Sequence, residues 1–134
     1  MKVRRVITGH SGGKSTFASD GPTRKSRDFV SVPGMSCALL WSTPTTPVVP
    51  HDRADSVSAG TTYLPQVGET RLMLVTFPPD SVMISDSFDQ AAAGQEYMEH
   101  IPDLAAKFEP DNPGMHTTDT VGDHFRRGGL AGAR

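Results

Sequence analysis

The chain is poor in cysteine, and this scarcity excludes two classes of protein. Its 134 residues contain a single cysteine, so neither an internal disulfide framework nor a cysteine-based zinc cluster can form. That residue, Cys37, lies in the apolar run Met35–Trp41, a setting typical of a small buried side chain. A catalytic nucleophile is the alternative, although no histidine or aspartate stands close to Cys37 in the sequence. We therefore expect the thiol in the core.

A strong charge imbalance and a long apolar run are both absent. The 13 basic and 15 acidic residues leave a net charge of −2, which predicts no general attraction to nucleic acid or to an anionic membrane. The basic clusters Lys2–Arg5 and Arg24–Arg27 are short and lack the interleaved aromatic residues of a nucleic-acid interface. No apolar run is long enough to span a membrane, and none follows the N-terminal basic residues as in a signal peptide. These features favour a reduced, soluble, cytoplasmic protein.

Aromatic residues are also scarce, at 7% of the chain. Trp41, Tyr63 and Phe77 could line a pocket, but aromatic residues on or near predicted strands are more often part of a core. We expect these three in the core, with the pocket as the alternative.

Glycine and proline, in contrast, are abundant, and their 13 and 11 residues indicate a turn-rich chain. β-Branched residues over Val3–Thr8, a glycine turn at His10–Lys14 and the segment Ser15–Ser19 predict a β-hairpin over residues 2–19. The polar segment Asp20–Arg27 that follows predicts a loop.

Three further segments predict strands. Phe29–Val32 is a short candidate before a Pro-Gly turn, and Ser36–Ser42 is a stronger one. The segment Thr43–Gly60 contains three prolines and has no packing period, which predicts irregular structure. Thr70–Phe77 is the clearest strand. Its unbroken apolar centre, Leu72–Val75, predicts burial on both faces or an internal position in a sheet.

The C-terminal part of the chain predicts helix. Ser87 and Gln90 have the spacing of a capping box at a helix start. The expected apolar face consists of Phe88, Ala91, Ala92 and Met98. Pro102 is expected to open a second, short helix, because proline is tolerated at the first helical position. Together the patterns predict a mainly β chain with a C-terminal helical segment, an α+β fold in one domain.

The segment Gly9–Ser15 has the composition of a phosphate-binding loop. It follows a predicted strand and ends in Gly-Lys-Ser. However, three residues rather than four separate Gly9 from Gly13, and the next residues predict a strand instead of a helix whose amides would hold the anion. We expect a hairpin turn here, with nucleotide binding as the alternative.

Histidine and carboxylate side chains, the ligands that many divalent metals favour, gather near the C-terminus. The group consists of Glu109, Asp111, His116, Asp119, Asp123 and His124. In the alternative, structural interpretation His116 is a solvated loop residue, while Asp111 and Asn112 shape a turn. Three other histidines stand alone: His10, His51 and His100. Of these, His100 is expected to interact with a helix C-terminus.

The segment Phe108–Val121, with the sequence FEPDNPGMHTTDTV, resembles the entry to the barrel in one branch of the cupin superfamily. The hairpin, the Pro-Gly-Met turn before an apolar strand, the Thr70–Phe77 strand and an acidic helix precede it in the same order. The resemblance covers residues 1–121 and implies a jelly-roll β-sandwich around a pocket, in a bacterial protein of small-molecule metabolism. It also implies a metal site with His116 as the first ligand, although Thr118 stands where a second histidine is expected.

From Gly122 onward the resemblance is lost. Residues 122–134 lack strand alternation, so we expect a disordered tail and an incomplete cupin-like jelly roll from a truncated or frameshifted gene. The first hypothesis is a cupin-like protein that has lost a complete metal or active site, which leaves catalysis, cofactor and small-molecule ligand open. The second is a non-catalytic binding or assembly module, for example a homo-oligomer, that pairs through exposed sheet edges.

Overall fold

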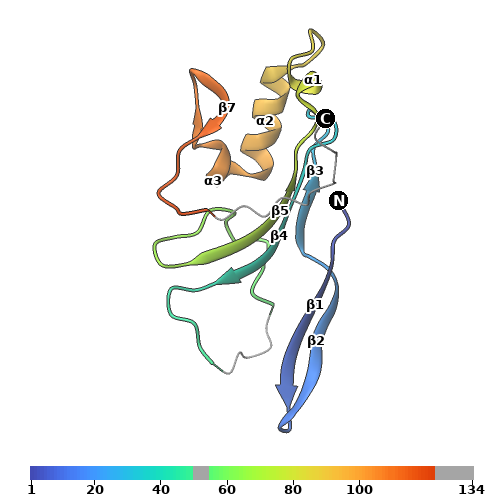
Figure 1. Cartoon of the computed structure of the whole chain (residues 1–134), viewed down its shortest axis with the longest axis vertical. Coiled ribbons are helices and arrows are strands. Elements are labelled where there is room, and N and C mark those ends of the chain that lie inside the picture. Colours follow the sequence, from blue (N-terminus) through green and yellow to red (C-terminus); the bar gives the residue numbers. More distant parts are fainter. Residues whose placement is uncertain (50–54, 123–134) are drawn as a thin grey trace, which may run out of the picture.

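The computed structural model describes residues 1–49 and 55–122 of the chain, which form small antiparallel sheets and a few helices (Figure 1). The predicted mainly β fold with a C-terminal helical segment is therefore confirmed. His51, Asp123 and His124 lie outside the described residues, as does the predicted tail from residue 123 onward.

The first sheet is the predicted N-terminal hairpin, which projects from the rest of the molecule (Figure 1). β1 (Arg4–Ser11) pairs antiparallel with β2 (Lys14–Pro22), and Gly12 and Gly13 form the turn with φ angles of 57° and 75°. Such a turn favours glycine because two successive residues have positive φ. The hairpin turn predicted for the Gly9–Ser15 segment is therefore confirmed.

Two predictions next to this hairpin are wrong. The predicted loop Asp20–Arg27 contains the end of β2 and most of a further strand, β3 (Lys25–Asp28). The predicted strand Phe29–Val32 is a loop, closed by a hydrogen bond from the Phe29 amide to the Met35 carbonyl oxygen (3.0 Å). Polar residues form a strand here because a neighbouring strand supplies their ladder partners, while Phe29 and Val32 of the loop turn into the core.

The central sheet has three strands in the order β3-β4-β5 and confirms the two stronger strand predictions. β4 (Ser36–Thr43) pairs antiparallel with β3 on one side and with β5 (Thr70–Thr76) on the other. The predicted Pro-Gly turn precedes β4, and its glycine, Gly34, has a φ of 89°.

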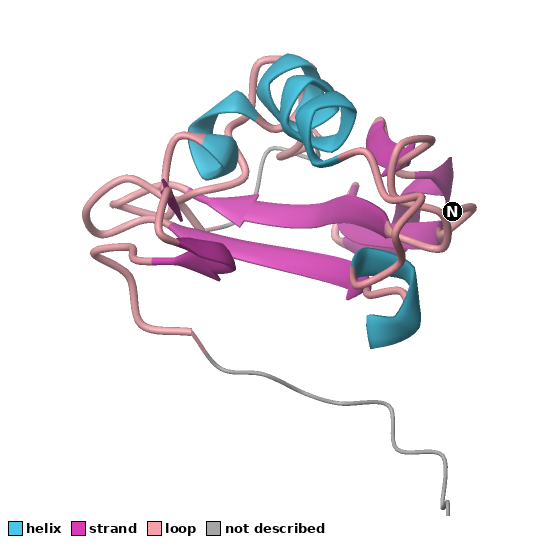
Figure 2. Cartoon of the chain, turned by 90° about the horizontal axis from the view of Figure 1, so that it is seen from above, coloured by secondary structure: helices cyan, strands magenta, loops and turns pink. Residues whose placement is uncertain are grey.

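Among the described strands, β5 lies at the edge of this sheet, and only one of its faces is covered. Met73 and Val75 pack against the core, whereas Leu72 and Leu74 on the opposite face are 56% and 44% exposed. The prediction of burial on both faces, or of an internal strand, is therefore wrong. The physical reason is that the long helix packs on one side of the sheet only (Figure 2).

Three helices and a small hairpin follow β5 in the described part of the chain. They are α1 (Asp80–Met83), α2 (Gln90–His100), α3 (Pro102–Ala105), β6 (Phe108–Glu109) and β7 (Asn112–His116). The short helix α3 begins at proline as predicted. The last two strands pair antiparallel as a separate two-stranded sheet.

The start and the buried face of α2 differ from the prediction. Asp89, and not Ser87, caps the helix, since its carboxylate accepts a hydrogen bond from the Ala92 amide at 2.9 Å. Met98 of the predicted apolar face is 56% exposed, whereas Glu96 is buried. The apolar pattern did not reveal this face because a glutamate lies within it.

The core lies between α2 and the covered face of the central sheet. Its buried members are Phe29, Val32, Met35, Cys37, Leu39, Val57, Tyr63, Ala93 and Ile101. Val57 belongs to the segment predicted to be irregular, Thr43–Gly60. Apart from Thr43, which ends β4, the described residues of this segment form neither helix nor strand. The Val57 side chain is nevertheless 0% exposed, so this irregular segment helps to close the core.

Glu96 connects α2 to the loop between β3 and β4 through two hydrogen bonds. Its Oε1 accepts a hydrogen bond from the Val30 amide at 2.8 Å, and its Oε2 accepts one from the Ser31 amide at 2.7 Å. Burial raises the pKa of the carboxyl, but the hydrogen bonds from this loop lower it by more, so the pKa lies below the ordinary value of glutamate. The folded chain therefore prefers the ionised carboxylate.

We predict that Glu96→Gln lowers the free energy of unfolding at neutral pH by about 1–3 kcal/mol, because an amide side chain cannot accept both hydrogen bonds. Since the folded pKa of Glu96 is below its unfolded value, the carboxylate stabilises the fold fully above the ordinary carboxyl pKa. That contribution is lost as the pH falls through the folded pKa, so the difference between wild type and variant should shrink in acid. Urea unfolding followed by circular dichroism measures both effects.

The control for this prediction is Glu99→Gln, on the same helix, because the Glu99 side chain is 74% exposed. We expect this change to alter stability by less than about 0.5 kcal/mol. Equal effects of the two substitutions at every pH would contradict the role assigned to Glu96.

Candidate functional site

The residue expected as a metal ligand, His116, stands at the end of β7 and is exposed. Its ring contacts that of Phe108 edge-on, with 5.8 Å between the ring centroids. Next to it, the Thr117 hydroxyl donates a hydrogen bond to Glu109 Oε1 at 2.8 Å. These contacts hold the small β6–β7 sheet together.

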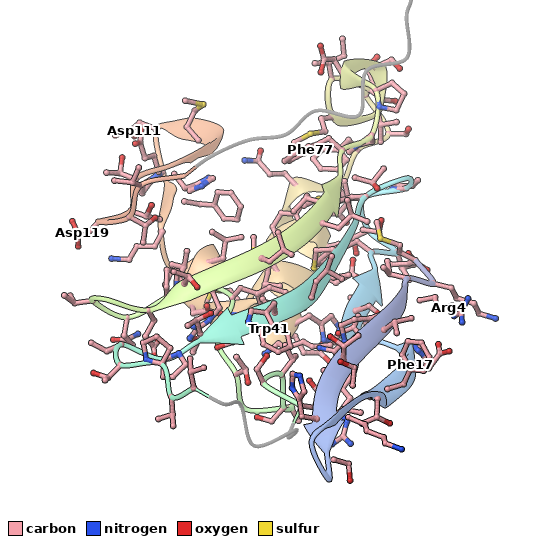
Figure 3. All side chains as sticks on the ribbon, turned by 60° about the horizontal axis from the view of Figure 1, so that its bottom comes forward. Arg4, Phe17, Trp41, Phe77, Asp111 and Asp119 are labelled. Carbon is pink, nitrogen blue, oxygen red and sulfur yellow. The ribbon has the colours of Figure 1, made fainter. Side chains whose placement is uncertain are left out.

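Within the described part of the chain, the other predicted ligands do not converge on His116. Asp111 and Asp119 are exposed, and they lie at separate points on the rim of this region (Figure 3). Over residues 1–49 and 55–122, no three His, Cys, Asp or Glu side chains are grouped closely enough to hold a metal ion. His116 as a metal ligand therefore stays a prediction.

We expect no tight binding of nickel, iron(II), manganese or zinc, because a divalent site needs about three protein ligands held on rigid elements. Isothermal titration calorimetry of the purified chain is the measurement. Stoichiometric binding that His116→Ala abolishes would contradict this expectation and identify His116 as a ligand. Binding that survives His116→Ala but is lost on changing Asp123 or His124 would place the ligands in the C-terminal residues.

Cys37 lies in the core, as predicted, with 5% of its surface exposed. Burial raises the pKa of its thiol, and burial likewise raises the pKa of the neighbouring Tyr63 hydroxyl. Both groups are therefore protonated at neutral pH, and a protonated thiol is a poor nucleophile.

We predict that a maleimide labels Cys37 slowly in the folded chain and rapidly in urea, because labelling requires an exposed thiolate. Mass spectrometry at fixed times after mixing is the measurement. A folded chain that is labelled as fast as the unfolded one would contradict the burial of this side chain.

The three aromatic residues that could have lined a pocket have different positions. Tyr63 is in the core, as expected, and the Nζ of Lys25 lies 4.7 Å from its ring centroid. Trp41 is half-buried on β4, whereas Phe77 is 74% exposed after the end of β5. The expectation of a core position is therefore wrong for Phe77.

A cleft of about 550 Å³ lies between the loop before β5, α3 and the segment after β7. Its lining includes Asp103, Lys107 and Glu69. Asp103 Oδ2 accepts a hydrogen bond from the Leu64 amide at 2.7 Å, and Glu69 Oε2 accepts one from the Arg71 guanidinium at 2.7 Å. Because these two carboxylates already accept hydrogen bonds from the walls of the cleft, they are less able to orient a ligand.

The outer edge of β5, together with the exposed side chains of Leu72 and Leu74, forms what we call the β5 surface. Within the described chain, no backbone hydrogen bond joins this edge to another segment. On the open face, Leu72 is the cross-strand partner of Trp41, and Leu74 is that of Ala38. Figure 3 views this face, with β4 and β5 in front of the helices.

The β5 surface lacks the features that usually prevent an edge strand from pairing with another chain. Such strands tend to carry proline or exposed charged side chains. β5 contains no proline, and its one charged residue, Arg71, has a side chain only 7% exposed. The Arg71 guanidinium donates hydrogen bonds to the Thr62 carbonyl oxygen (2.9 Å) and to Glu69 (2.7 Å). The edge is therefore open to a further strand.

The sequence contained a signal for this surface that the strand prediction did not use. Leucine and threonine alternate as Thr-x-Leu-x-Leu-x-Thr from Thr70 to Thr76, which is the pattern of one face of a strand. Met73 and Val75 between them are also apolar, and the resulting apolar run hides this pattern by predicting burial on both faces or an internal strand.

Comparisons of the chain with protein-family models, with curated proteins and with solved structures found no match. Among the helices described here, none has the length and apolarity needed to cross a bilayer.

Proposed function

We propose that the chain is a non-catalytic assembly module that binds a β-strand of another chain along the β5 surface. The observation that carries this proposal is the open edge of β5 with the adjacent exposed leucines, Leu72 and Leu74. An added strand would satisfy the backbone amides and carbonyls of the edge with ladder hydrogen bonds, as in β-augmentation. The side chains of the added strand would cover part of the exposed leucines of the β5 surface.

Covering the β5 surface with a bound strand is energetically more favourable than leaving it exposed to solvent. Each Å² of apolar surface removed from water stabilises a complex by about 25 cal/mol, and ladder hydrogen bonds add direction and register to this non-directional term. Two leucines on an unprotected edge therefore favour a bound strand, whereas scattered exposed apolar residues elsewhere require no such explanation.

The second candidate function follows from the cupin-like resemblance. In this proposal the described sheets are part of an incomplete cupin-like jelly roll, β5 receives the next strand of that barrel, and the protein binds a small molecule in bacterial metabolism. The observation that favours it is the cleft of about 550 Å³, which falls in the usual size range of ligand pockets. This function comes second because the carboxylates of Asp103 and Glu69 in that cleft are hydrogen-bonded to other residues of the chain.

We predict that the wild-type chain associates as its concentration rises and that Leu74→Lys shifts it toward monomer, weakening association by about tenfold or more. The reason is that a lysine on the edge strand places a charge where a partner strand would have to pack. Sedimentation velocity over a range of concentrations is the measurement, and far-ultraviolet circular dichroism verifies that the variant folds.

The matched control is Phe17→Lys, since Phe17 is an equally prominent apolar side chain, 72% exposed, on β2 of the separate N-terminal hairpin. This change should leave association unchanged. A monodisperse monomer with a cooperative thermal transition at every concentration would remove the case for an assembly module.

A further inference from the structure

We infer that the strand bound at the β5 surface is β5 of a second copy of this chain, antiparallel and related by a two-fold axis that passes beside Met73. This inference rests on the proposed function and adds the identity of the partner and the register. It would join the two central sheets into one sheet in the order β3-β4-β5-β5-β4-β3, with the α2 helices of both copies on the same face.

The open face of β5 has a sequence that is symmetric about Met73. The residues on this face are Thr70, Leu72, Leu74 and Thr76, whose order reads the same in both directions. In an antiparallel pair centred on Met73, Leu72 of one copy lies opposite Leu74 of the other, and Thr70 lies opposite Thr76. Like side chains therefore meet at every position of this face, and such cross-strand pairs stabilise a sheet.

A two-fold interface must be complementary to itself, and this register meets that requirement. All seven residues of β5 are paired, since the strand has three residues on each side of Met73. Along β5, alternate residues direct their backbone N–H and C=O groups toward the open edge. Because the pairing is centred on a residue, each such residue of one copy lies opposite such a residue of the other, so their backbone groups can form hydrogen bonds.

The charges near β5 are compatible with this register. Arg71 lies opposite Val75 of the second copy, and Glu69 lies opposite Phe77. No like charges face each other, so the repulsion that penalises like charges in cross-strand pairs is avoided. The Arg71 and Glu69 side chains also keep their hydrogen bond within their own copy.

Neighbouring registers match less well. Centring the pair on Leu72 places Thr70 opposite Leu74 and Thr76 opposite Gly68, which has a φ of 81° and is outside the strand. Centring it on Leu74 places Leu72 opposite Thr76 and Thr70 opposite Pro78, which has no amide to donate. Each alternative keeps one like pair at its centre, Leu72 with Leu72 or Leu74 with Leu74, and replaces the other like pairs of the open face with mixed ones.

Disulfide cross-linking between copies tests the partner and the register together. Cβ atoms directly opposite in an antiparallel pair are about 4.5–5.5 Å apart, whereas diagonal neighbours are about 7–8 Å apart, too far for an easy disulfide. Tagged Leu72→Cys mixed with untagged Leu74→Cys should therefore form a mixed disulfide about tenfold faster than either variant alone forms its own. Met73→Cys should link to itself.

Copper-phenanthroline oxidation and non-reducing gel electrophoresis give the rates, with wild type as the control because its Cys37 is buried. Self-linking of Leu72→Cys or of Leu74→Cys as fast as the mixed pair would overturn the Met73-centred register. Because Met73 packs against the core, the mixed pair of surface variants decides the question if Met73→Cys does not fold.

The two proposals fail in different ways. If no cross-link forms but Leu74→Lys still reduces association, then β5 binds a strand other than β5 of a second copy; the inference is wrong and the assembly function stands. If the chain neither cross-links nor associates at any concentration, both are wrong. Preferential mixed cross-linking together with dissociation by Leu74→Lys supports both.

Discussion

The position of α2 depends on the hydrogen bonds between the Glu96 carboxylate and the two loop amides of Val30 and Ser31. A buried carboxylate is costly unless its lone pairs are satisfied, so the helix and the β3–β4 loop must come together with little freedom. That contact brings Phe29 and Val32 of the loop under the helix, where they pack with Ala93 and Ile101. The rest of the core is built around this junction.

Fixing α2 on one side of the sheet leaves the other side without a comparable cover. The sheet therefore has a closed face, filled by Met73 and Val75 among others, and an open face with Leu72 and Leu74. Because β5 is also the edge strand of the described sheet, its open face and its unpaired backbone occur at the same place. This coincidence distinguishes β5 from an isolated exposed residue such as Val67. Phe17 is also on an edge strand, but that strand, β2, carries the exposed charged residues Lys14 and Asp20 and ends in Pro22.

Four reactive side chains of the described chain have structural roles. Cys37 fills the core, His116 packs on Phe108, and Asp103 and Glu69 hold backbone amides in loops. Such roles stabilise the fold and reduce the availability of these groups for chemistry. Binding through backbone groups and apolar side chains, in contrast, needs only what β5 already presents.

The sequence by itself determined the local features with strong short-range causes: the Gly-Gly hairpin turn, the strands β4 and β5, the proline start of α3 and the burial of Cys37. Tertiary structure alone decided which polar residues form a strand and which polar residues are buried. The polar strand β3 exists because β4 pairs with it, and Glu96 is buried because two amides from a loop over 60 residues away in sequence reach it. It also decided which face of β5 stays open. An apolar run in the sequence indicates that its side chains are more stable when they are removed from water. Only the placement of α2 determines which of these side chains are buried.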